Sequence, residues 1–325
     1  MTTSEHSQRQ TPAQYLPQPK PPADPISPVR STTDEYTGRK RKLVYPPAPR
    51  PSPVPIVDNH AHLDFRDGLV QVTPTEAMDA AATVNVVGAI QVATDLESAR
   101  YTLEALDQEP RLRGALAIHP NDTVHLAQNK TLDDAIDTIR DLAAHPQVVC
   151  IGETGLDYYR TQGEEHWEIQ KYAFKRHIEL AVELGLALQI HDRQAHDDVI
   201  ATLLSMNELP EHVVFHSYSG DEHMAKVLNE HGWYASFSGI VTFKNNATSR
   251  AAAQLMREEL LLVETDAPFL TPHPHRGRPN APYLVPHTLY QLAETRDQSV
   301  EDLGNVIFEN TERVYGKFQV DQARK

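Results

Sequence analysis

Residue types that bind metals recur at a few places in this sequence, and His60 and His62 form one closely spaced pair. A single alanine separates the two histidines at the end of an apolar run. Side chains alternate across a β-strand with a period of two, so both imidazoles point the same way if the run is a strand. Histidine is the commonest neutral metal ligand and an acid or base near pH 7. The spacing therefore indicates a chelating pair.

Four more candidate ligands end or follow other apolar runs. They are Glu153, His191, His216 and Asp266. A single residue of this kind at a strand end is usually a hydrogen-bonded structural residue, but the ends of the strands meet at one mouth if the runs form a closed barrel. Burying several imidazoles and carboxylates together is costly without a counter-charge, which divalent cations would supply. The pattern therefore predicts a metal centre.

This donor set favours two cations over one. Four imidazoles and two carboxylates suit a paired site, in which the ions lie about 3.5–4 Å apart and Glu153 can bridge them. Because the set contains no thiolate, Zn²⁺, Mn²⁺ and Mg²⁺ all remain open. Asp58, Asp64 and Glu264 lie within two residues of proposed ligands, and we interpret them as residues that orient the ligands. The predicted cofactor is two divalent metal ions (Mg, Mn or Zn).

The apolar runs themselves are eight candidate strands. Successive runs end 22 to 38 residues apart, which leaves room for a helix and a return loop between each pair. Helical periodicity is visible over 165–184 and 221–231, each followed by a glycine that can end a helix, and over 299–316, which opens with Ser-x-x-Asp. The predicted strands are 55–60, 85–94, 112–119, 147–153, 186–191, 212–216, 233–238 and 260–266.

Eight mostly apolar strands that alternate with helices predict an α/β fold, a (β/α)8 TIM barrel over residues 54–325. A doubly wound open sheet has a similar strand count, but it normally carries a Gly-rich phosphate loop after the first strand. Residues 58–62 read Asp-Asn-His-Ala-His at that place. The barrel is therefore the preferred interpretation, with the candidate ligands at its catalytic face.

Residues 1–53 differ in composition from the rest of the chain. Residues 1–55 contain 13 of the 24 prolines and little apolar periodicity, so we expect 1–53 to be a disordered, Pro-rich basic tail. The tail has eight Lys and Arg against four Asp and Glu, or +4, which leaves −19 for the body in a total of −15. A basic arm could touch an anionic partner, but a solvated tail is the preferred interpretation. Its deletion is expected to change neither stability nor turnover.

The overall composition excludes several classes of protein. A net charge of −15 argues against a protein that coats nucleic acid through a broad basic surface. The single cysteine, Cys150, cannot form an internal disulfide, and the sequence has neither an apolar stretch of membrane length nor a signal-peptide pattern at its N-terminus. We therefore expect a cytoplasmic protein without a membrane partner, and a monomer.

The motifs, taken in order, resemble the TatD family of metal-dependent deoxyribonucleases, in the amidohydrolase-like TIM-barrel superfamily. The resemblance spans about residues 56–316. Ser217 and Tyr218 stand where the family commonly has Cys and Phe, and Ala61 where Cys is frequent, but none of the three is a proposed ligand. The segments that carry the resemblance are 58–64, 117–120, 151–159, 191–193, 216–220, 236–243 and 262–270.

The resemblance implies metal ligation by the same six residues and hydrolysis of phosphodiesters in DNA. In this reading Glu153 bridges the cations and Asp266 accepts the proton of the attacking water, so these two are the candidate catalytic residues. The acidic body provides no long basic groove. We therefore expect an exonuclease that acts on single-stranded or frayed DNA ends.

Basic residues near the predicted mouth are the candidates for substrate binding. We expect contacts from His119, Arg193, His275 and Arg276; the last two lie in the loop after the eighth strand, where barrels often bind phosphate. A second reading remains open, in which the same barrel hydrolyses another ester or amide, such as a lactone, an aminoacyl ester or a phosphotriester. Glu153 stands where such enzymes often carry a carboxylated lysine, which favours the nuclease.

Overall fold

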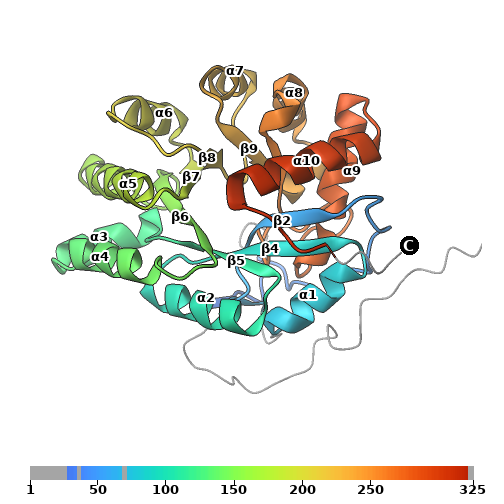
Figure 1. Ribbon diagram of the computed structural model, residues 1–325, viewed down its shortest axis with the longest axis horizontal. Coiled ribbons are helices and arrows are strands. Elements are labelled where there is room, and N and C mark those ends of the chain that lie inside the picture. Colours follow the sequence, from blue (N-terminus) through green and yellow to red (C-terminus); the bar gives the residue numbers. More distant parts are fainter. Residues whose placement is uncertain (1–27, 35–37, 68–71, 321–325) are drawn as a thin grey trace, which may run out of the picture.

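The computed structural model describes residues 28–34, 38–67 and 72–320, and its centre is one sheet of eight parallel strands. Each strand pairs with its neighbours in chain order, and helices lie around the outside (Figure 1). All eight predicted strands are present. They are β2 (Ile56–Ala61), β4 (Val86–Val92), β5 (Leu112–Leu116), β6 (Val148–Asp157), β7 (Ala187–Arg193), β8 (Val213–Phe215), β9 (Tyr234–Phe237) and β10 (Leu261–Val263).

The first and last strands meet just beyond the end of β10. Ala61 forms a parallel bridge with Ala267. The Asp266 N–H donates to the His60 carbonyl at 2.9 Å, and the His62 N–H donates to the Ala267 carbonyl at 2.7 Å. The sheet is therefore a nearly closed barrel, and the predicted TIM barrel is confirmed.

Ten α-helices in the described residues connect or follow the strands. The predicted helices correspond to α5, α7 and α10; Gly185 and Gly232 end the first two with φ of 64° and 70°, and Ser299 caps the third by accepting from the Asp302 N–H at 3.0 Å. The helices are α1 (Pro74–Ala82), α2 (Leu96–Gln108), α3 (Pro120–Gln128), α4 (Leu132–Leu142), α5 (Glu164–Leu184), α6 (His196–Leu204), α7 (Glu222–His231), α8 (Ala247–Leu255), α9 (Pro286–Arg296) and α10 (Val300–Tyr315).

The strands of the barrel are almost completely buried. Every residue of β2, β8, β9 and β10 is inaccessible or nearly so. Full burial of one Leu, Ile or Phe side chain contributes about 1.5–3 kcal/mol to folding, so this core is the main source of rigidity. The charged residues at the strand ends are thereby held on a stiff frame. None of the described helices has an apolar stretch long enough to cross a bilayer.

Within the predicted tail, residues 28–34 and 38–53, which we call the N-terminal arm, pack on the barrel. β1 (Val29–Arg30) pairs in parallel with β3 (Arg66–Asp67). Tyr45 is 8% exposed. The Tyr283 hydroxyl donates to the Pro46 carbonyl at 2.6 Å. Residues 1–27 lie outside the described residues, and the domain boundary at residue 53 stays a prediction.

Candidate metal centre

The six predicted ligands gather at the carboxyl ends of the barrel strands. Glu153 is at the middle of the group, and its two carboxylate oxygens face different histidines. Oε2 lies 3.6 Å from Nε2 of both His60 and His62. Oε1 lies 2.6 Å from His191 Nδ1 and 2.8 Å from His216 Nε2. One carboxylate therefore joins two sets of imidazoles that come from different strands.

The orientation of His60 and His62 is set by bonds to their outer nitrogens. His60 Nδ1 lies 2.8 Å from Gln189 Oε1, and His62 Nδ1 lies 2.9 Å from the Val92 carbonyl. Both acceptors require an N–H on Nδ1, which leaves the lone pair on Nε2. The two Nε2 atoms are only 3.0 Å apart, and Asp266 Oδ1 lies within 3.7 Å of each. Such facing acceptors need a proton or a cation between them, so this donor set fits a metal.

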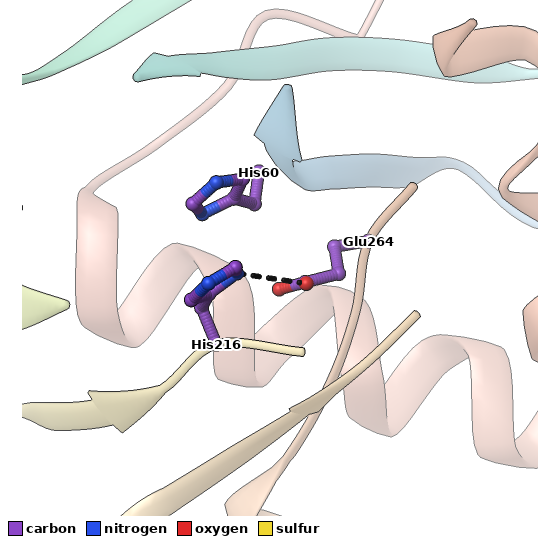
Figure 2. A group of neighbouring side chains, drawn as sticks. All are labelled: His60, His216 and Glu264. Atoms are coloured by element: carbon purple, nitrogen blue, oxygen red, sulfur yellow. Dashed lines mark hydrogen bonds and ion pairs between the residues drawn. The ribbon is translucent and has the colours of Figure 1, made fainter. Parts of the chain in front are cut away.

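Figure 2 shows how His216 is held against His60. The two rings stack with centroids 3.9 Å apart, and His216 Nδ1 lies 3.2 Å from Glu264 Oε1. The same oxygen accepts from the Ser217 N–H at 2.7 Å. Glu264 therefore lies behind His216 and turns its Nε2 toward Glu153, as expected of an orienting residue. Glu264 Oε2 is buried and has no hydrogen bond within the described part of the chain.

Asp157 holds the remaining histidine of the group. Its Oδ2 lies 3.1 Å from His191 Nε2, while Nδ1 of the same ring meets Glu153. Asp266 follows β10 in a left-handed backbone conformation, with φ of 55°. Non-glycine residues rarely adopt this conformation, and it is typical of positions that a functional site constrains. Its side chain is 13% exposed, so it faces both the histidine pair and the mouth.

The electrostatics follow from burying acids and imidazoles together. Burial raises the pKa of Glu153, but His216 and His119 lower it more, so the pKa is well below its usual range and the carboxylate stays charged. Burial lowers the pKa of His216, yet Glu153 and Glu264 raise it well above normal. Burial likewise lowers the pKa of His62, and Asp266 and Glu153 together raise it to about 9. Protons on imidazoles balance the acids here, and divalent cations would balance the same charge.

Three groups of side chains, two of which share His60, each have donor atoms within 4.8 Å of one another. They are His60 with His62 and Asp266, His60 with His216 and Glu264, and His119 with Glu153 and His191. His119 was expected to contact substrate, but its Nε2 lies 3.6 Å from Glu153 Oε1, inside the cluster. The chemistry of these donor groups fits metal binding.

The other predicted substrate residues lie further out. Arg193 ends β7, and its guanidinium lies 4.0 Å from the centre of the Tyr159 ring. Arg276 is exposed and packs on Phe243 at 4.2 Å. The His275 ring faces His287, with centroids 5.9 Å apart. Among the described residues, no interaction joins His275 or Arg276 to the six candidate ligands.

Sequence reasoning missed Gln189 as a residue of the site. Its amide donates to the Asn59 carbonyl at 2.9 Å and to the Tyr315 hydroxyl at 3.0 Å, which leaves Oε1 for His60. The signal was present, because Gln189 is a polar residue two positions before His191 in an apolar strand and therefore shares its face.

Comparisons with known proteins agree with this geometry. Residues 57–316 match the sequence model of the TatD related DNase family. A protein of Mycobacterium tuberculosis named as an uncharacterized metal-dependent hydrolase TatD is 40% identical over 80% of this chain and 98% of its own length. The uncharacterized metal-dependent hydrolase YcfH of Escherichia coli is 34% identical over 83% of this chain and 97% of its own.

Solved structures share the fold. The crystal structure of YJJV, a TatD homologue from Escherichia coli, superposes with a TM-score of 0.72 at 24% identity and covers 81% of this chain and 98% of that one. Fold and site together define a metal-dependent hydrolase built on a TIM barrel. Within that class, the chain belongs to the TatD related DNase family, as its motifs predicted.

Proposed function

We propose that this hydrolase cleaves phosphodiester bonds and acts as an exonuclease on the ends of single-stranded DNA. The observation that supports it best is the position of Glu153, whose oxygens face the His60 and His62 pair on one side and His191 and His216 on the other. A shared carboxylate of this kind suits two cations, the number that clamps both the attacking and the leaving oxygen of a phosphoryl displacement.

The residues of the cluster divide naturally between two cations. His60, His62 and Asp266 would hold one, His191 and His216 the other, and Glu153 would contribute an oxygen to each. When bound, divalent cations neutralise phosphate oxygens and lower the pKa of water. Asp266 would accept the proton of the attacking water, since its carboxylate faces both the histidine pair and the mouth.

Arg193 and Tyr159 are the proposed contacts for the adjoining nucleotide. Tyr159 is 42% exposed, a large value for an aromatic ring beside a barrel mouth. An exposed ring can stack on any base, and a guanidinium beside it can bind the phosphate. His119 would contact the substrate or a cation from inside the cluster, and His275 and Arg276 would meet DNA further from the scissile bond.

Action at an end follows from the charge of the body. A formal charge of −19 outside residues 1–53 disfavours binding along the phosphates of a long duplex. A short single-stranded end needs only the local charges of the mouth. A cytoplasmic location and a monomeric state stay predictions.

The test compares linear and circular single-stranded DNA of the same sequence, using protein stripped with EDTA and resupplied with Mg²⁺ or Mn²⁺. We expect mononucleotide products from the linear substrate only, and a loss of several orders of magnitude in the Asp266→Asn variant, whose side chain has nearly the same shape but no base. Cleavage of the circle would contradict the exonuclease. Turnover of lactone, aminoacyl ester or phosphotriester substrates without any DNA cleavage would instead support the second reading.

A further inference from the structure

The N-terminal arm comes near the candidate metal centre through β1. Val29 pairs with Arg66, and Arg30 pairs with Asp67, directly after the loop that follows the His60 and His62 pair. The family match begins only at residue 57, so the arm lies outside it. Arg30 is therefore a cation that this chain adds to the family barrel.

Arg30 contacts two segments, one that follows β2 and one that follows β10. Its Nη1 donates to the Pro268 carbonyl, two residues after Asp266, and lies 3.4 Å from Asp67 Oδ2. Its guanidinium lies 5.2 Å from the centre of the Phe269 ring. That ring in turn lies 6.2 Å from the His62 ring. One aromatic side chain thus separates Arg30 from a candidate metal ligand.

Some N–H donors of the Arg30 guanidinium make no hydrogen bond to the described part of the chain. Both of its hydrogen bonds use Nη1, and within residues 28–34, 38–67 and 72–320 no hydrogen bond engages Nε or Nη2. The side chain is 19% exposed, so part of it is open to solvent. Burial lowers the pKa of Arg30, while the Asp67 and Asp266 carboxylates act in the opposite direction. The Nε and Nη2 pair forms the planar fork that binds two oxygens of one phosphate.

A second arginine also holds the arm, through contacts that do not need Arg30. Arg41 pairs with both oxygens of Asp67, and its Nη2 lies 2.7 Å from Oδ2. Arg41 Nε also donates to the Gly277 carbonyl at 3.1 Å, in the loop that follows β10. Since Arg41 is 2% exposed and fully engaged in these contacts, it serves as an anchor. The arm should therefore stay in place when Arg30 is replaced.

We propose that Arg30 is a specificity-determining residue that binds a substrate phosphate next to the scissile one through its Nε and Nη2 edge. This inference rests on the proposed nuclease function. It explains why a positively charged segment is packed beside the mouth of an acidic barrel. The proposal also predicts that Arg30 contributes to substrate binding only when the substrate has a second phosphate.

The experiment uses the full chain with Mn²⁺ and two substrates, a single-stranded pentanucleotide and bis(p-nitrophenyl) phosphate, a diester with no neighbouring phosphate. Arg30→Met should raise KM for the pentanucleotide about tenfold, the effect of one charge-assisted contact, and leave kcat within about twofold. Both constants for the small diester should stay within about twofold. The salt dependence of log KM for the pentanucleotide should weaken by about 0.7, the value for one phosphate contact on a single strand.

Two further variants separate binding from folding. Arg30→Gln keeps a donor for the Pro268 carbonyl and should show the same change in KM as Arg30→Met. Arg50→Met removes an arm arginine that packs on the Tyr290 ring of α9 at 5.0 Å, and it should leave both substrates unaffected. Melting temperatures verify that each variant is folded.

Three results would overturn the inference. An unchanged KM for the pentanucleotide in both Arg30 variants would exclude the phosphate contact. Equal losses on both substrates, accompanied by a lower melting temperature, would show that Arg30 is only a structural clamp. Wild-type protein that hydrolyses the small diester but no oligonucleotide would refute the proposed nuclease, and the role of Arg30 with it.

Discussion

At the scale of single residues, Glu153 makes the sharpest prediction because each of its oxygens serves a different set of imidazoles. Glu153→Ala should lower hydrolysis about a thousandfold or more and reduce the metal content per chain, measured by elemental analysis after dialysis. Glu153→Gln keeps the shape and one oxygen acceptor, so its metal content should fall less. Retention of full activity by the alanine variant would refute a bridging role.

His177 lies beneath the site and gives a prediction about pH. Its Nδ1 lies 2.8 Å from the Ala173 carbonyl in α5, and its Nε2 accepts from the Ile118 N–H at 3.1 Å. Burial lowers its pKa to about 4, although the bond to Ala173 acts in the opposite direction. The unfolded chain therefore binds this proton at a higher pH than the folded chain does. Stability is fully present above about pH 6.5 and is lost as the pH falls toward 4.

The loss from this histidine amounts to about 3 kcal/mol at most. His177→Gln keeps a donor and an acceptor but does not titrate. Urea unfolding at a series of pH values should show a shallower decline for this variant between pH 6.5 and 4, with the other titrating groups cancelling in the comparison. Parallel pH profiles for the two proteins would show that His177 is not the group responsible.

Individual residues differ in how well their roles can be predicted from the sequence. The six candidate ligands could be predicted from the sequence because each is a polar residue at the end of an apolar run. The barrel topology then brings such ends together. The role of Asp157 could not be predicted, since nothing in its local sequence shows that its carboxylate contacts His191. The place of His119 inside the cluster likewise depends on a distance to Glu153 that only the folded chain has.

At the scale of elements, Asp58 connects the first strand to the last. Its Oδ1 accepts from the Thr265 N–H at 2.8 Å, and its Oδ2 accepts from the Thr265 hydroxyl at 2.5 Å. Asp58→Ala would leave two buried donors unpaired, so we expect the free energy of unfolding to fall by about 2–4 kcal/mol. Hydrolysis should fall as well, because Asp266 follows Thr265 directly.

Asp58→Asn is the matched control for this contact. Its amide keeps one acceptor oxygen in nearly the same volume, so the loss of stability should be smaller than for alanine. Denaturant unfolding and hydrolysis rates are measured on both variants to test this contact. Similar stabilities for the alanine variant and the wild type would contradict the proposed connection.

The elements of the barrel were largely predictable, and the departures have physical reasons. Strands buried on both faces read as apolar runs, and all eight appear where such runs occur. β6 extends to Asp157, four residues past the predicted end, because Gly155, Leu156 and Asp157 continue to pair with β7. Periodicity alone could not predict β1, since two residues carry no repeat.

At the scale of the whole molecule, the packed arm leads to a different prediction about stability from the one that the sequence suggests. The sequence suggests that residues 1–53 can be removed without effect, yet the arm buries Tyr45 and pairs Arg41 with the buried Asp67. Loss of one such aromatic side chain costs about 1.5–3 kcal/mol, so deletion of 1–53 should lower the melting temperature by about 5 °C or more. The control is a protein that lacks residues 1–27 only, and its melting temperature is measured by the same thermal unfolding experiment. Equal melting temperatures for the two deletions would contradict this account.

The arm escaped prediction because its contacts are long-range. Proline-rich segments without apolar periodicity usually stay unfolded. What holds this segment is an ion pair across 26 residues and hydrogen bonds to carbonyls from side chains more than 230 residues away, such as Arg278 to Val44. No local pattern encodes such partners.

The joint between the first and last strands has a consequence for biosynthesis. Asp58 and Thr265 lie 207 positions apart, and the carboxylate that faces His60 and His62 comes directly after the later of them. A ribosome must therefore translate most of the message before the hydrolytic centre can assemble. Truncated products of interrupted translation would carry the early histidines without Asp266, and they would be inert toward the nucleic acids around them.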